Sequence, residues 1–519
     1  MDRKKSFTSL INEGYSFKGD SITVGSAMFD GAVIGDAHVR IPLKTMNRHG
    51  LIAGATGTGK TKTLQVISEQ LSDKGVPVLL MDVKGDLSGI AMPGEEKPFI
   101  TERHSKINLP YVTKGFPVEL MSISQQDGVR LRATVSEFGP VLLSRILGLN
   151  DTQEGVVSVI FKYCDDNQLA LLDLKDLKKA IQYVTEEGKA EIEKDYGKIS
   201  TVTTGIIMRK IIELEQQGAD LFFGELSFDI HDLLRKDKYG NGYINIIRLT
   251  DIQDRPKLFS TFMLSLLAEV YSQMPEKGDM DKPELVIFID EAHLIFDQAG
   301  KALLDQIETI VKLIRSKGIG LFFVTQNPAD VPADVLSQLG LKVQHALRAF
   351  TALDRKAIKL TAENYPLSEY YKTDEIITNL GIGEALVTTL NEKGIPTPLA
   401  ATMLRAPASR MDILTPLEIS LINDSSVLVR KYSQDIDRES AYEILEKKVS
   451  LMEKEAELDE KRKQLEKERG REEKLSRPAA TYRTTYTRRT KTPQEQVVKV
   501  LTSATFIRGV FGILRKVMK

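Results

Sequence analysis

The stretch GATGTGKT, residues 54–61, decides the fold of this 519-residue chain. It fits the phosphate-binding pattern G-x-x-x-x-G-K-[ST] at every fixed position. Glycines let the backbone curl until several N–H groups point at one phosphate, and the following helix adds the positive end of its dipole. We therefore predict that ATP binds here. The predicted ATP-binding residues are Gly54, Ala55, Thr56, Gly57, Thr58, Gly59, Lys60, Thr61 and Lys62.

Acidic residues follow an apolar run in LVIFIDEAH, residues 285–293. An apolar run without alternation is typical of a buried parallel strand. Lys60 is expected to reach the β- and γ-phosphates, while Thr61 and Asp290 bind Mg²⁺. Glu291 is expected to orient or deprotonate the attacking water. The alternative, ordinary surface acids at a strand end, is disfavoured by the loop upstream. His293 is more readily explained as a structural histidine.

Further candidates lie at strand ends and helix ends. Gln326 ends the strand FFVTQ and is predicted to sense the γ-phosphate or position the water, although a simple turn before Asn327 would also explain it. Arg315, Arg348 and Arg355 can stabilise the charge of a transition state, or can equally form ion pairs or cap a helix. Asp82 and Asp86, in MDVKGDLSG at 81–89, suit a metal or partner contact and a tight turn equally well.

Composition limits the classes of protein. The net charge of −1 gives no overall positive field, although a ring can concentrate basic groups in its channel. Cys164 is the sole cysteine, so a disulfide framework is excluded and a reducing, cytoplasmic location is expected. The sequence shows neither a signal peptide nor an apolar run of the roughly 18 to 20 residues that span a bilayer.

The hydrophobic pattern predicts an α/β fold with a mostly parallel sheet flanked by helices. Strand, loop, helix and strand follow one another in 47–93, with Leu64, Ile67 and Leu71 on one helical face. The predicted segments are a short N-terminal β-rich segment at 1–46, the first part of the core with a β excursion at 47–127, a helical insertion at 128–240, the second part of the core at 241–410, a charged helical extension at 411–476, and a basic linker with an amphipathic tail at 477–519.

The C-terminal segments carry separate expectations. Leu445, Val449, Met452 and Ala456 form a seam of only about two heptads, so a single charged helix is expected rather than a long coiled coil. The tail at 494–519 is amphipathic and basic. It is expected to form a helix that docks on the ring or on a neighbour or, alternatively, to lie on a membrane surface.

With these motifs in view, the chain resembles the HerA/FtsK superfamily of ring-forming P-loop motor ATPases, and more closely its bacterial HerA-like members. The resemblance covers about residues 20–410. The stretches that carry it are NRHGLIAGATGTGKT, MDVKGDLSG, LSRILGLNDTQEG, FIDEAHLIFD, LIRSKGIGLFFVTQNPADVP, QLGLKVQHALRAFT and GIGEALVT. It implies a RecA-like core, ATP hydrolysis with Mg²⁺, assembly into a homo-oligomeric ring, often a hexamer, and action on DNA.

The resemblance also suggests roles for two arginines. In the superfamily an arginine just before the glutamine strand acts across subunits, and Arg315 occupies that place. Arg348 matches an arginine of the later strand that approaches the phosphates. HerA motors carry a larger N-terminal β-barrel, which we expect to be truncated or absent here. The favoured hypothesis is a DNA translocase or helicase. The alternatives are a regulatory or assembly ATPase that acts on protein partners, with membrane contact through the tail, and a nucleotide-binding scaffold that hydrolyses poorly.

Overall fold

The computed structural model describes residues 3–278, 280–296, 301–434, 436 and 438–475. The predicted linker and amphipathic tail at 477–519 lie outside these residues. Contacts divide the chain into a compact first unit, Met1–Val449, and a second unit, Ser450–Lys519. This division falls inside the predicted charged extension and not at its start.

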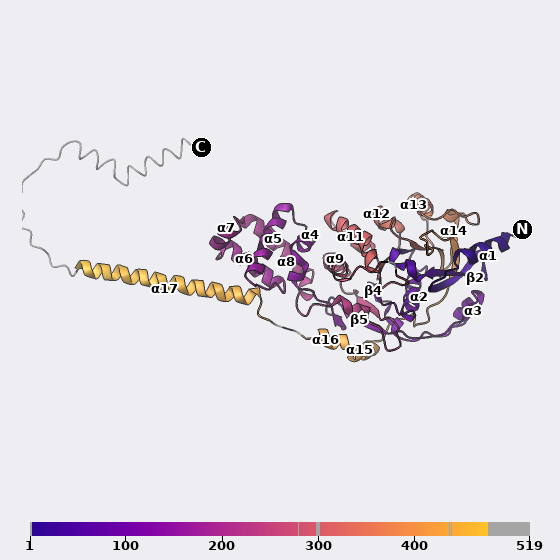
Figure 1. Ribbon diagram of the computed structural model, residues 1–519, viewed down its shortest axis with the longest axis horizontal. Coiled ribbons are helices and arrows are strands. Elements are labelled where there is room, and N and C mark those ends of the chain that lie inside the picture. The colour runs from indigo at the N-terminus through magenta and orange to yellow at the C-terminus, as the bar shows by residue number, and fades with distance from the viewer. Residues whose placement is uncertain (1–2, 279, 297–300, 435, 437, 476–519) are drawn as a thin grey trace, which may run out of the picture. The chain divides into compact units, whose positions relative to one another are not determined.

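Among the described residues, twelve strands form one sheet in the first unit (Figure 1). Their order is β2-β1-β12-β11-β10-β3-β9-β8-β4-β7-β5-β6, and neighbours from β10 to β6 are parallel. The strands β11, β12, β1 and β2 continue the sheet in antiparallel pairs. The strands are β1 Ser21–Phe29, β2 Ala32–Pro42, β3 Gly50–Ala53, β4 Val78–Asp82, β5 Val118–Ser122, β6 Val129–Arg130, β7 Ile244–Arg248, β8 Leu285–Ile289, β9 Ile319–Thr325, β10 Leu341–His345, β11 Glu384–Thr388 and β12 Ala400–Leu404.

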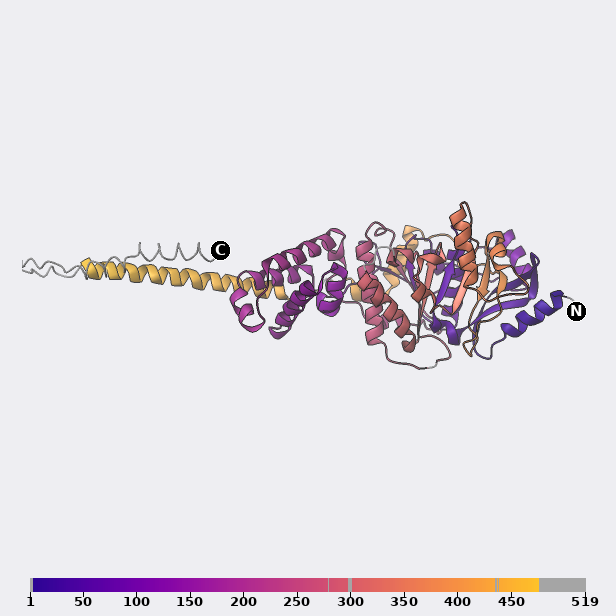
Figure 2. The same cartoon turned by 90° about the horizontal axis from the view of Figure 1, so that it is seen from above.

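Helices cover both faces of this sheet, and the helical insertion forms a group beside it (Figures 1 and 2). The hydrophobic pattern also predicts a long helix from roughly Pro256 to Gln273, and the structure contains it as α9. The helices are α1 Arg3–Gly14, α2 Lys60–Asp73, α3 Pro98–Lys106, α4 Val135–Leu147, α5 Asp151–Asp166, α6 Leu174–Thr185, α7 Lys189–Asp195, α8 Thr201–Gln216, α9 Pro256–Gln273, α10 His293–Phe296, α11 Lys301–Ile314, α12 Ala333–Leu336, α13 Ala352–Glu363, α14 Thr373–Asn379, α15 Pro416–Ser425, α16 Val427–Tyr432 and α17 Ala441–Leu475.

The two faces of the sheet are packed by different helices because successive strand residues point to opposite sides. Leu64 and Ile67 of α2 share one buried cluster with Phe288 of β8. Val311 of α11 shares the other cluster with Ile287, the preceding residue of β8. The central strands are therefore buried on both faces, as their unbroken apolar runs predict. The mostly parallel α/β class is confirmed.

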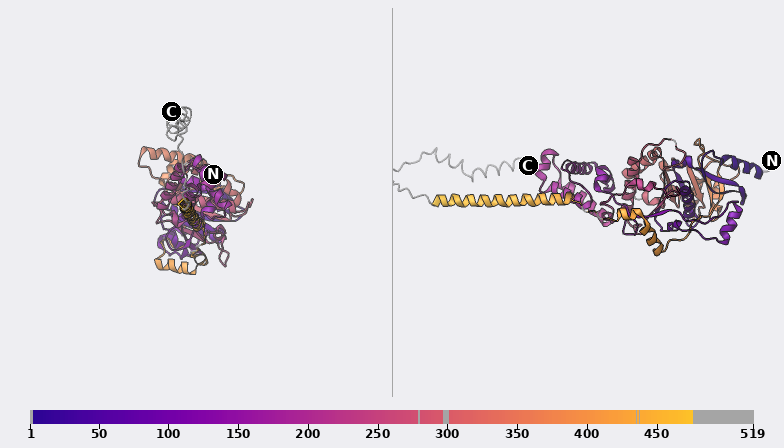
Figure 3. Two further views of the ribbon diagram at one scale, coloured as in Figure 1. Left: turned by 90° about the vertical axis from the view of Figure 1, so that its left-hand side faces the viewer. Right: turned by 60° about the horizontal axis from the view of Figure 1, so that its bottom comes forward.

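Within the predicted insertion at 128–240, residues 135–216 carry the helices α4–α8, whereas Val129–Arg130 form β6 of the main sheet. The core of these helices is continuous with that of the sheet. In the right-hand view of Figure 3, α4–α8 again form one group beside the strands. Thr134, Asn150 and Asp173 begin α4, α5 and α6 with reciprocal capping boxes. Buried side chains of these helices belong to the same cluster as α9 and α11. Movement of the insertion would therefore disturb the packing behind the sheet.

The β-rich expectation was wrong for two short segments. Residues 3–14 form α1, which buries Phe7 and Ile11 one turn apart, and residues 98–106 form α3, with Pro98 in its first turn. Short helices gain their stability mainly from tertiary packing, so the local pattern gave little signal. The β-rich part of the N-terminal segment is the hairpin β1–β2, which extends the main sheet because Gly25 of β1 pairs with Leu404 of β12.

The charged helix α17 begins in the first unit, where Leu445 is buried. From residue 451 to 471 its side chains are exposed. That α17 is a single charged helix rather than part of a coiled coil stays a prediction. No helix in the described part of the chain combines the length and the apolar character needed to cross a bilayer.

Candidate nucleotide site

The glycine loop joins the end of β3 to the start of α2. Gly54, Gly57 and Gly59 have positive φ angles of 152°, 78° and 109°. A Cβ atom on Gly54 would lie 2.5 Å from Cβ of His345, so the loop has no room for a side chain there. The Gly54 N–H donates to the carbonyl of Thr325 in β9 over 3.3 Å. The loop therefore takes its shape from backbone freedom and from anchoring to the neighbouring strand.

The side chain of Lys60 folds back onto this loop. Its Nζ donates to the carbonyl oxygens of Gly54 at 2.6 Å and Ala55 at 3.2 Å. Burial lowers the pKa of Lys60, and the positive charge of Lys84 lowers it further. These two carbonyls are neutral acceptors, so the charged oxygens of a phosphate would bind the Lys60 ammonium group more strongly and replace them. The Nζ of Lys62 instead donates to the Met411 carbonyl at 2.6 Å, so its ammonium group is engaged away from the loop.

Asp290 and Glu291 follow β8 at the edge of the sheet where β3 ends. The register pairs Ile289 with Phe323 of β9, and Ala53 with Thr325 two residues further along β9. Carboxyl ends of parallel strands share one edge, where α/β proteins bind their ligands. Two motifs that are far apart in the sequence are thereby brought to one place.

The carboxylate of Asp290 is suited to bind a cation. It is buried, and its Oδ2 has no hydrogen-bond partner within the described part of the chain. Burial and then the negative charge of Glu291 raise the pKa of Asp290 to about 7. A buried carboxylate oxygen without a partner is costly, and a divalent cation would offset that cost. Thr61 lies at the start of α2, where its hydroxyl would supply the second oxygen expected at a nucleotide-bound Mg²⁺.

Glu291 is held in an unusual backbone conformation. Its φ is +48°, in the left-handed region that side chains rarely adopt. The following Ala292 N–H donates to the Val324 carbonyl at 3.0 Å, which fixes this turn against β9. The carboxylate forms an ion pair with Lys84 Nζ and lies 3.2 Å from Nδ1 of His293. His293 thus contacts the predicted base, a contact that the sequence did not indicate.

Lys84 is a site residue that sequence reasoning missed. It lies in the turn after β4, and the carboxylate of Asp82 organises this turn by accepting the N–H groups of Gly85, Asp86 and Leu87 at 2.7, 3.1 and 3.1 Å. Burial raises the pKa of Asp82 to about 6 despite these bonds. The geometry favours the turn interpretation of Asp82. The signal for Lys84 was its position in a K-G-D turn at the carboxyl end of a buried strand.

Gln326 and Arg348 also lie at the nucleotide edge. Thr56 Oγ1 donates to Gln326 Oε1 at 3.1 Å, so the amide rests against the loop. The expectation that Arg348 belongs to a strand was wrong. The strand β10 ends at His345, because its last pair with β11 is that of His345 with Ala385. Arg348 is exposed, and its Nη1 donates to the Thr378 carbonyl at 2.9 Å.

Arg315 lies at the opposite edge of the sheet. It belongs to a short 3₁₀ turn that precedes β9, whereas Gln326 follows the end of the same strand. Seven residues of strand span roughly 20 Å, more than an arginine side chain can reach. Arg315 therefore does not line the site of its own chain. Arg355 lies on α13, where it is exposed.

His345 packs against the loop, and no sequence pattern pointed to this role. Its Nε2 lies 2.9 Å from Thr63 Oγ1 on α2. Burial lowers the pKa of His345 to about 4, and the charge of Lys60 contributes to this shift. The ring is therefore neutral at physiological pH and connects the strand β10 to the first turn of α2.

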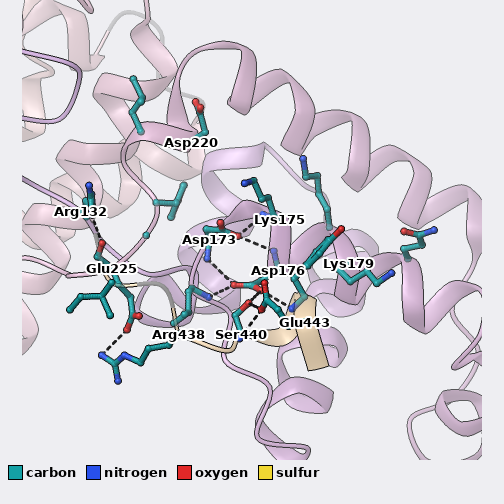
Figure 4. A pocket seen from close by; sticks show the side chains of 18 of the residues that line it. Arg132, Asp173, Lys175, Asp176, Lys179, Asp220, Glu225, Arg438, Ser440 and Glu443 are labelled. Atoms are coloured by element: carbon teal, nitrogen blue, oxygen red, sulfur yellow. Dashed lines mark hydrogen bonds and ion pairs between the residues drawn. The ribbon is translucent and has the colours of Figure 1, made fainter. Parts of the chain in front are cut away.

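A large cleft lies elsewhere, among α6, residues 220–225 and the start of α17 (Figure 4). Its volume is about 1030 Å³, and both charge signs line it. Asp176 there accepts hydrogen bonds from Ser440 Oγ at 2.5 Å and from the Tyr442 N–H at 2.8 Å. Arg438 pairs with Glu225 at 2.9 Å. These contacts anchor the first turn of α17 to the insertion, and no residue of the glycine loop lines the cleft.

The strand, glycine loop and helix, together with the acid pair on the next strand but one, define a RecA-like P-loop NTPase fold. The chain belongs to the helicase HerA-like C-terminal family, whose model matches residues 31–518. Similar solved structures include the plasmid coupling protein TrwB in complex with a non-hydrolysable ATP analogue, with a TM-score of 0.52, 14% identity, and coverage of 78% of this chain and 94% of that chain. The unbound form of TrwB gives a TM-score of 0.51 at 15% identity, with the same coverage. These likenesses concern the fold.

Curated relatives carry names that refer to DNA. The DNA double-strand break repair helicase HerA of Sulfolobus acidocaldarius is 23% identical over 361 residues, which is 69% of this chain and 66% of the relative. The protein of the same name from Sulfurisphaera tokodaii is 26% identical over 363 residues, with the same shares. This chain thus spans about two thirds of the length of these relatives.

Proposed function

We propose that this protein is an ATP-hydrolysing motor that translocates along or unwinds DNA as a ring of identical subunits, of the hexameric type. The observation that carries the ATPase proposal is the meeting of the Lys60 loop and the Asp290–Glu291 pair at one edge of the sheet. Membership of the HerA-like family and the names of the curated relatives support DNA as the substrate.

The site residues have separate tasks in this proposal. Lys60 exchanges its carbonyl partners for phosphate oxygens. Thr61 and Asp290 would hold Mg²⁺, which would neutralise phosphate charge. Glu291 orients the attacking water and accepts its proton, while Gln326, already against the loop, fixes the direction of attack. These roles use positioning and electrostatics rather than covalent chemistry.

The ring is proposed from the position of Arg315. Because Arg315 lies at the far edge from its own loop, it can serve a nucleotide only in a neighbouring subunit. A guanidinium that reaches the γ-phosphate from a neighbour would link hydrolysis to assembly. An exposed Arg348 at the nucleotide edge is a second candidate for such a contact.

The test is ATP turnover of the full chain with and without duplex or single-stranded DNA, over a range of salt concentrations. DNA is expected to stimulate turnover, with an effect that falls steeply as salt rises. Lys60→Ala should lose turnover because it loses the phosphate contact, and Glu291→Gln should bind ATP but hydrolyse it orders of magnitude more slowly. Unchanged turnover in Lys60→Ala would show that the loop is not the site.

A second candidate function is an assembly ATPase that acts on protein partners. The helical insertion and the exposed, charged part of α17 favour it, because they offer surfaces that ATP hydrolysis does not need. Equal turnover with and without DNA at every salt concentration would favour this candidate over the motor.

A further inference from the structure

The ion pair between Lys84 and Glu291 occupies the group that the proposed reaction needs. A general base must present a carboxylate oxygen to the attacking water within one hydrogen bond. Here Glu291 Oε1 is in contact with the Lys84 ammonium group, and Oε2 faces His293. Both carboxylate oxygens therefore have cationic or polar neighbours in this state. An ammonium group on the carboxylate lowers its basicity, so loss of the Lys84 contact would make Glu291 a stronger base for the attacking water.

The turn that presents Lys84 is rigidly built. Three N–H groups of residues 85–87 bond to the Asp82 carboxylate, and Gln253 donates to the carbonyl of Val83. Gly85 has a φ of +78°, and a Cβ atom on it would lie 2.7 Å from Cγ2 of Thr250. The backbone is thereby fixed, while the Lys84 side chain remains partly exposed, at 38%. Its ammonium group can therefore move without the turn moving.

Lys84 lies at the edge of the sheet where the phosphates are expected. It follows β4, which runs parallel to β8, and its Nζ contacts Glu291 directly after β8. Its charge lowers the pKa of Lys60, the residue expected to hold the β- and γ-phosphates. Burial lowers the pKa of Lys84, but the contact with Glu291 and the charges of Glu291, Asp290 and Asp86 outweigh it and raise the pKa overall. Lys84 therefore places a cation beside the acid pair, at the edge of the sheet where the loop lies. A terminal phosphate there would carry more negative charge than one carboxylate, so it would attract Lys84 more strongly.

We propose that Lys84 distinguishes nucleoside triphosphates from diphosphates: its ammonium group leaves Glu291 for the terminal phosphate, and this exchange releases Glu291 to the attacking water. The inference rests on the proposed ATPase function and adds a positioning residue to it. It makes the ion pair a restraint on the base until a γ-phosphate is present. No proton or bond is transferred in this exchange.

The test compares the affinities of a non-hydrolysable ATP analogue and of ADP, by calorimetry, for the wild-type chain and for Lys84→Met. Methionine keeps the length of the side chain and removes its charge. The analogue should bind about tenfold more weakly to Lys84→Met, the loss expected for a charge-assisted contact, and ADP should bind equally well. Lys84→Arg should restore most of the analogue affinity. Lys342→Met is the matched control, because Lys342 is a partly buried lysine on β10 that donates to the Asn364 carbonyl.

A double-mutant cycle with Glu291→Gln tests the exchange itself. Glu291→Gln should tighten binding of the analogue because the phosphate no longer competes with a carboxylate for Lys84. This gain should largely vanish in the Lys84→Met background. If Glu291→Gln tightened binding of the analogue equally in both backgrounds, loss of the Glu291 negative charge alone would explain the tighter binding. That result would overturn the proposal.

Two further outcomes separate the proposals. If Lys84→Met weakened the binding of the analogue and of ADP equally, or weakened neither, the role of Lys84 would be overturned and the ATPase proposal would stay intact. If the wild-type chain binds neither nucleotide more tightly than Lys60→Ala, the nucleotide site itself is refuted.

Discussion

The placement of Arg315 leads to a complementation experiment. In the wild-type ring each site would combine Lys60 of one subunit with Arg315 of its neighbour. Arg315→Ala should leave ATP binding intact and reduce turnover by roughly 10³-fold or more, the range found for arginine fingers. Lys60→Ala should remove turnover through loss of the phosphate contact. Each variant alone should therefore be nearly inactive, for a different reason.

Mixing the two variants should restore activity by a predictable amount. In a ring assembled at random from equal parts, half of the subunits carry an intact Lys60, and half of their neighbours carry an intact Arg315. Roughly one quarter of the interfaces then hold both residues, so turnover should reach about a quarter of the wild-type value. This expectation depends on the length of β9, because roughly 20 Å of strand keep Arg315 from reaching the nucleotide site of its own subunit.

The assay is steady-state ATP turnover across a series of mixing ratios, with ring assembly confirmed by particle mass. Activity should peak near equal proportions and vanish at both ends. Lys312→Ala is the matched control, because Lys312 is an exposed cation in the last turn of α11. This variant should hydrolyse ATP at the wild-type rate. Inactivity at every ratio in confirmed rings, or normal turnover by Arg315→Ala alone, would refute the assignment.

Other predictions concern stability. Burial, followed by the charges of Glu137 and Asp229, raises the pKa of Glu269 from 4.5 to about 7. The folded state thus binds more protons between these values, and stability falls as pH rises through that range. Glu269→Gln should raise the free energy of unfolding by up to about 3 kcal/mol at pH 8 and hardly at pH 4, as measured by urea unfolding; an equal gain at both would contradict this. Asp176→Ala should lower the free energy of unfolding by about 3 kcal/mol, because buried donors lose their acceptor. It should also expose the start of α17 to protease. Unchanged proteolysis would disprove the anchoring role of Asp176.

Strongly patterned segments were predictable from the sequence. The bounds of α9 and the strands that carry the two nucleotide motifs follow from apolar runs, caps and prolines that act within a few residues. The helices α4–α8 lie within the segment expected to be helical, although that segment also contains β6. The short helices α1 and α3 were missed, because each buries few side chains and depends on distant partners. The end of β10 at His345 was missed because the partner strand decides where pairing stops.

The sequence by itself determined the loop chemistry: glycines where φ must be positive, a lysine and a threonine at the helix start, and an acid pair after a buried strand. Tertiary structure alone decided the neighbours of these groups. It brought Lys84 to Glu291, set His345 against the loop and put Arg315 at the far edge of the sheet. The physical reason is that backbone preferences act locally, whereas ion pairs and burial depend on which strands lie side by side.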